Sequence, residues 1–66
     1  MTRIEAAKTA LESYRDLLVK KGYSHFDDDY DTLTALITDL LHLADGMLLP
    51  AHTIVHDATE TYEKER

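Results

Sequence analysis

Histidine and carboxylate side chains are the residues of this 66-residue chain whose types and spacing suit chemistry. His52 and His56 are four residues apart and Glu60 follows four later, a spacing that can bring imidazoles to one metal ion. The pattern lacks the glutamate that zincins carry after the first histidine, and catalysis needs a third ligand. We therefore favour a polar helix face and expect no cofactor. Metal binding by the two histidines stays an alternative.

A second candidate is His42, which lies three residues from both Asp39 and Asp45. A histidine between carboxylates suits a general base or a pH-sensitive pair. The chain offers no partnering nucleophile, no cysteine and no glycine-rich loop, and it is too short to build a deep pocket. We interpret His42 as a boundary residue bonded to a neighbouring aspartate, and we expect the protein not to be an enzyme.

Four aspartates crowd residues 27–31 around Tyr30. A calcium-binding EF-hand loop counted from Asp27 needs glycine at its sixth position and glutamate at its twelfth, where the chain has Thr32 and Thr38. Two interpretations stay open together. The aspartates stabilise the N-terminus of a helix, and they form an acidic epitope with Tyr30 as its aromatic anchor.

The distribution of charge indicates the kind of partner. Residues 22–63 contain nine acids and no lysine or arginine, whereas residues 1–21 carry a net charge of +2. Such a surface repels nucleic acid and attracts basic protein surfaces, so we expect a basic protein partner and no direct nucleic-acid binding. The predicted partner-binding residues are Asp27, Asp28, Asp29, Tyr30, Asp31, Asp39, Asp57, Glu60 and Glu63.

Three helices must position these side chains. Apolar residues recur at steps of three and four within residues 3–21, 29–45 and 50–63, which is typical of amphipathic helices. The middle run is the most apolar and is expected to be a central helix between two flanking ones. The sequence thus predicts an all-α, three-helix single domain over residues 1–66.

The expected helix ends follow from local signals. Thr2 and Glu5 have the spacing of a capping box, and Gly22 suits the position just after a helix. Gly46 is expected to end the middle helix. Pro50 is expected in the first turn of the third, where its missing N–H group costs nothing.

The small size of the chain predicts a second copy. A core of this size supplies little net stability, and without cysteine neither disulfides nor thiolate metal sites are available. Three leucines exceed the needs of three short helices: Leu43, Leu48 and Leu49. Either they fill the core through a bend of the chain, or they form an exposed patch that a second copy covers, and we favour this homodimer interface. No apolar run reaches the roughly 18 residues of a membrane span, so we expect a cytoplasmic protein that does not bind membranes.

The run from Thr34 to Gly46, followed by Ala58 and Tyr62, resembles small helical phage and mobile-element proteins over about residues 32–64. Within that run the matching positions are Thr34, Leu36 (one step from the usual leucine), Leu40, His42 and Asp45. The chain departs from the family at residues 47–50, where the relatives are more polar. The resemblance implies no known enzyme activity and points to a phage accessory protein. Small, acidic, helical phage proteins are often inhibitors of host defence, anti-CRISPR proteins among them.

These observations lead to two expectations about function. The first is a phage-type inhibitor in the host cytoplasm, whose acidic surface occupies a basic groove that normally holds nucleic acid. The alternative is a structural or regulatory dimerisation module whose apolar surface is the working one.

Overall fold

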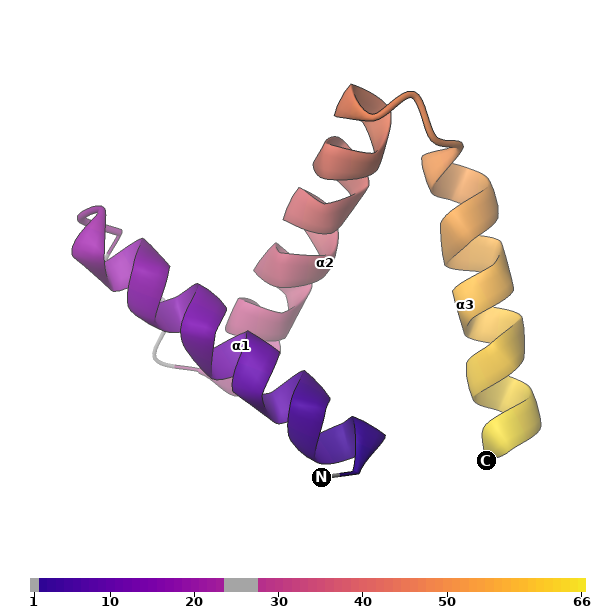
Figure 1. The fold of residues 1–66 in the computed structure, drawn as a ribbon, viewed down its shortest axis with the longest axis horizontal. Coiled ribbons are helices and arrows are strands. Elements are labelled where there is room, and N and C mark those ends of the chain that lie inside the picture. The colour runs from indigo at the N-terminus through magenta and orange to yellow at the C-terminus, as the bar shows by residue number, and fades with distance from the viewer. Residues whose placement is uncertain (1, 24–27) are drawn as a thin grey trace.

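The computed structural model describes residues 2–23 and 28–66 and forms three α-helices, with no strand in these ranges. They are α1 (Arg3–Lys20), α2 (Asp29–Gly46) and α3 (Ala51–Glu65). In Figure 1, α2 and α3 form a hairpin whose arms diverge from their connection, and α1 crosses the start of α2. The all-α, three-helix prediction is confirmed, and each helix ends within two residues of its expected bounds.

The ends of α1 follow the local signals in the sequence. The Thr2 hydroxyl oxygen accepts a hydrogen bond from the Glu5 N–H group at 3.1 Å. At the other end, the N–H groups of Gly22 and Tyr23 donate to the carbonyls of Val19 and Leu18. This pair of bonds is a Schellman motif, and it needs the left-handed backbone that Gly22 adopts at φ 92°.

The connection between α2 and α3 differs from its prediction. Gly46 does not end α2 but is its last helical residue, and Leu48 takes the left-handed position with φ 59°. The Leu49 N–H group donates to the Ala44 carbonyl at 2.9 Å, which completes a second Schellman motif without glycine at its centre. Pro50 precedes α3 as its N-cap instead of lying in its first turn.

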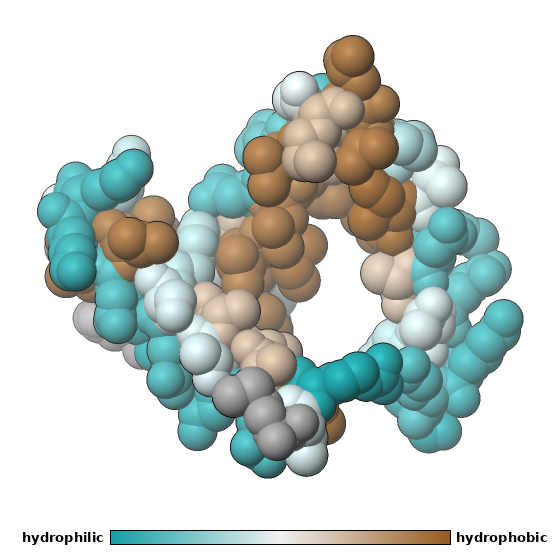
Figure 2. Space-filling view, viewed as in Figure 1, coloured by the Kyte–Doolittle hydropathy of each residue, from teal (hydrophilic) through white to brown (hydrophobic). Residues whose placement is uncertain are grey.

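Packing between the helices is sparse. Helix α2 packs against both α1 and α3, whereas α1 and α3 are linked by an exposed ion pair between Arg3 and Glu65 at 2.9 Å. Among the described residues, Ala44 is the one buried hydrophobic residue and Thr32 the one buried polar residue. Helix α2 is therefore the central helix between two flanking ones, as expected, but its neighbours leave much of its apolar surface exposed. Figure 2 shows hydrophobic side chains along the facing sides of α2 and α3, around an opening.

None of the described helices has both the length and the hydropathy that crossing a bilayer requires.

The two glycines give a matched test of this backbone geometry. Apart from the adjoining residues and the local helix backbone, no atom lies within 4 Å of the position that an alanine Cβ would take at either glycine, so the backbone conformation decides the effect of alanine. We expect Gly22→Ala to lower the free energy of unfolding by about 1 kcal/mol, because alanine disfavours the left-handed region. Gly46→Ala should raise it by about 0.5 kcal/mol, because Gly46 is helical. Urea unfolding at one protein concentration measures both, and effects of the same sign would contradict the assigned geometry.

Candidate functional site

Aspartates at the start of α2 bond to other groups of the same chain. The Asp28 carboxylate is the N-cap and accepts a hydrogen bond from the Tyr30 N–H group at 2.8 Å. The Asp29 carboxylate pairs with the Arg15 guanidinium of α1. Tyr30 and Asp31 are exposed, and Asp27 lies outside the described residues. Two of the predicted binding aspartates thus stabilise the helix start or the α1–α2 contact.

Arg15 joins α1 to the acidic end of α2. Its guanidinium also donates to the Thr32 hydroxyl oxygen at 3.2 Å, and that hydroxyl donates to the Asp28 carbonyl at 3.0 Å. The hydrogen bond from Arg15 to Asp29 raises the pKa of the guanidinium, so Arg15 stays protonated. The role of Arg15 was not predicted from the sequence. A signal for this role was present in the sequence, because Arg15 directly follows Tyr14, which is one of the regularly spaced apolar residues of the first helix.

Asp39 faces α1 instead of joining the other acids. Its carboxylate accepts a hydrogen bond from the Tyr14 hydroxyl. That bond, with smaller contributions from burial and from the charge of Asp39, raises the pKa of Tyr14 to about 12. The predicted binding residue Asp39 therefore holds α1 and α2 together.

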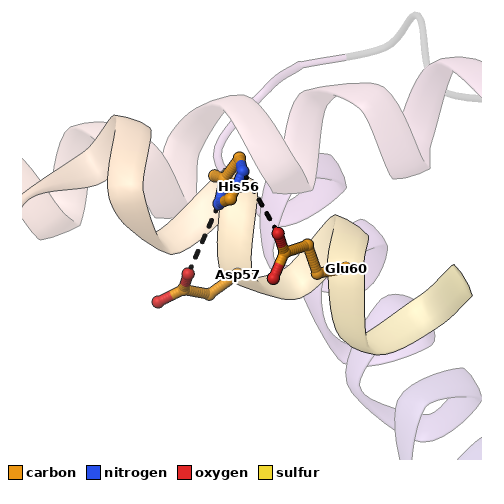
Figure 3. Close-up of side chains that lie close together, drawn as sticks. All are labelled: His56, Asp57 and Glu60. Atoms are coloured by element: carbon orange, nitrogen blue, oxygen red, sulfur yellow. Dashed lines mark ion pairs between the residues drawn. The ribbon is translucent and has the colours of Figure 1, made fainter. Parts of the chain in front are cut away.

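The acids of α3 form the more accessible part of the acidic surface. His56 lies between Asp57 and Glu60, with nitrogen-to-oxygen distances of 3.5 and 3.4 Å (Figure 3). Glu63 pairs with Arg66 at 3.2 Å. We call Asp57, Glu60 and Glu63 the α3 acidic face. All three residues are exposed, and none is drawn into the helix packing.

The side chains of His56, Asp57 and Glu60 offer three potential metal ligands within 4.8 Å of one another. All three are exposed. His52 was the other histidine of the metal alternative. It lies beside His42 and Asp45 around a hollow of about 460 Å³ between α2 and α3. Of the residues in the metal alternative, His56 and Glu60 thus belong to this cluster and His52 does not.

An apolar groove of about 390 Å³ runs between α2 and α3. This groove was not predictable from the sequence, because a closed core would have the same pattern of apolar residues. It is lined by Ile37, Leu40, Leu41, Ile54, Val55, Ala58, Thr59 and Tyr62. No charged side chain is part of this lining, so the groove is a different surface from the α3 acidic face.

The predicted dimer residues lie at the α2–α3 connection, and all three are exposed. Leu43 is on the last turns of α2, while Leu48 and Leu49 follow its end. Leu48 has a side chain that is 92% exposed, and its left-handed backbone is held by the hydrogen bonds of the second Schellman motif.

Comparison with known proteins adds no family or fold relative. No family model matches the chain, and neither the curated proteins nor the solved structures contain a match.

The Tyr14–Asp39 hydrogen bond predicts a loss of stability at high pH. Because the folded-state pKa of Tyr14 is raised from 10.0 to about 12, the bond contributes fully below pH 10 and is lost as the pH rises toward 12. The urea midpoint of the wild type should fall over this range, and Tyr14→Phe should remove part of that fall. Tyr30→Phe, which changes an exposed tyrosine, is the control and should keep it. Equal behaviour of both variants would contradict the assignment.

Zinc titration tests the cluster at His56. We expect excess zinc to leave the unfolding temperature of the wild type unchanged, because structural zinc sites use four well-held ligands and this cluster offers three exposed ones. His56→Ala is the comparison. A zinc-dependent rise in the wild type that His56→Ala abolishes would instead establish a metal site.

Proposed function

We propose that this protein is a small acidic protein-binding protein that covers a basic surface of another protein. In its most specific form, the proposal is that the protein is a phage-type inhibitor of a host nucleic-acid-binding complex. The proposal assigns no catalysed reaction to the chain. The observation that carries the proposal is the α3 acidic face, together with Asp31 at the start of α2. These carboxylates are exposed in a segment without lysine or arginine.

The contacts of the other acids narrow the proposed surface. Asp28, Asp29 and Asp39 already bond within the chain, so they contribute charge more than free ligand atoms. Glu63 of the α3 acidic face pairs with Arg66, whose guanidinium also lies 5.6 Å from the centre of the Tyr62 ring. A basic partner therefore gains most from Asp57 and Glu60, where the neighbouring histidine is charged only when protonated.

A second candidate function is a helical dimerisation module, and a separate observation favours it. The α2–α3 connection exposes Leu43, Leu48 and Leu49, and Leu48 does so in a strained backbone conformation. Strain of this kind accumulates at functional contacts. In this alternative the apolar surface is the working one and the acids keep the module dispersed.

Charge neutralisation at two places tests the first proposal. The test variant carries Asp57→Asn, Glu60→Gln and Glu63→Gln. The control variant carries Glu5→Gln, Glu12→Gln and Asp16→Asn on α1, which changes the net charge equally. Each immobilised chain is exposed to a nuclease-treated bacterial lysate. We expect wild type and control to retain basic nucleic-acid-binding proteins and the test variant to lose them.

Salt dependence completes the test. The affinity of a retained protein, measured in solution, should fall steeply between about 50 and about 500 mM salt, because exposed charges are screened over this range. An affinity that does not change with salt would contradict the electrostatic proposal, as would equal losses in the two variants.

A further inference from the structure

We propose that the apolar groove between α2 and α3 is covered by the same groove of a second copy, so that two α2–α3 hairpins form a four-helix bundle. The inference rests on the dimerisation expected of this chain, and it assigns the interface to a different face from Leu43, Leu48 and Leu49. Helix α1 stays outside the bundle, held to α2 by Arg15 and Tyr14.

The spacing of the apolar residues supports a bundle. Alternating steps of four and three run along α2 through Leu33, Ile37, Leu40, Ala44 and Met47, and along α3 through Ala51, Val55, Ala58 and Tyr62. This is the repeat of helices that pack side by side in bundles. We call these two rows the bundle rows.

The bundle rows are only partly covered within the single chain. Ala44 is buried and Ala51 is half-buried, whereas the large members of both rows, with Ile54 beside them, are between 39% and 59% exposed. A residue packed by one neighbour and open on its other side has such intermediate exposure. In a four-helix bundle the open side faces the second hairpin.

The size of the uncovered surface fits a permanent dimer. A folded monomer of 7.5 kDa exposes about 4,200 Å² by the usual scaling with mass. This chain exposes 5764 Å², an excess of about 1,500 Å². Obligate dimers bury roughly 1,000–2,500 Å² on each chain. The Cα radius of gyration, 13.2 Å, likewise exceeds the roughly 11 Å of a compact chain of this length.

The chemistry of the groove favours a second copy over a basic partner. Its lining contains no carboxylate to meet a lysine or arginine, and burying an unpaired charge there is costly. Two apolar grooves related by a twofold axis complement each other without burying a charge. The α3 acidic face is not part of the lining, so two acidic chains can meet without placing these carboxylates inside the interface.

Light scattering and thermal unfolding of the full chain test the inference. We expect a dimeric mass at micromolar concentration and an unfolding temperature that rises with protein concentration, because folding and association are then one equilibrium. A helical monomer whose unfolding temperature is independent of concentration would overturn the proposal.

Matched substitutions locate the interface. Leu40→Gln changes a groove residue that is 51% exposed, and Leu17→Gln changes an α1 residue that is 58% exposed. We expect the first to raise the dimer dissociation constant at least about tenfold and the second to leave it unchanged. If Leu40→Gln does not fold, the concentration dependence of wild-type unfolding decides whether a dimer exists, and Ala58→Gln replaces it as the groove variant.

The variant Leu48→Glu separates this interface from the dimerisation function proposed above. We expect Leu48→Glu to remain dimeric, because Leu48 is not part of the groove lining. Loss of the dimer in Leu48→Glu, with Leu40→Gln still dimeric, would overturn the groove assignment and leave dimerisation through the connection standing. Binding of a basic partner is measured separately through its salt dependence, so its failure does not affect this result.

Discussion

The apolar stripe of α2 is wider than its two neighbours can cover, and the other features of the structure depend on this mismatch. The residues of α2 that face α1 meet polar and aromatic side chains, while those that face α3 line an open groove. Burial of apolar surface is the main favourable term in folding. A chain that leaves this surface half covered gains less free energy on folding. The uncovered apolar surface favours binding to another apolar surface.

Two different kinds of interaction hold the neighbours of α2 in place. On one side, Arg15 and Tyr14 bring α1 against the acids of α2 through directional hydrogen bonds. On the other side, the left-handed residue Leu48 sets the direction in which α3 leaves the connection. The first contact is polar and specific and the second is a backbone turn, so neither supplies the apolar burial that the groove still lacks.

The acids of the chain divide into two groups with different consequences. Asp28, Asp29 and Asp39 of α2 act within the chain, through the N-cap and the contacts with Arg15 and Tyr14. The α3 acidic face has no such duty toward the rest of the fold. The absence of lysine and arginine from residues 22–63 therefore overstates the free acidic surface, because Arg15 and the Tyr14 hydroxyl of α1 bond to two of its aspartates.

The fold was predictable from local signals, and the open packing was not. Spacing of apolar residues and the signals at Thr2 and Gly22 predicted the helices, because these depend on neighbours within a few residues. Gly46 misled, since the chain places a leucine where glycine is usual. The pairs of Arg15 and Tyr14 with acids of α2 join residues 14 and 25 positions apart, and no periodicity within one helix reveals such contacts. The groove was also hidden, because a closed core and an open half-bundle need the same apolar rows.

The most direct test of this account is hydrogen exchange of the backbone amides in α2 and α3 at two protein concentrations. If a second copy completes the bundle, protection of amides along Leu33–Ala44 and Val55–Tyr62 rises with concentration, because exchange then requires dissociation. Protection that is the same at high and low concentration would show that the single chain is stable with its groove open, and that result would contradict the account.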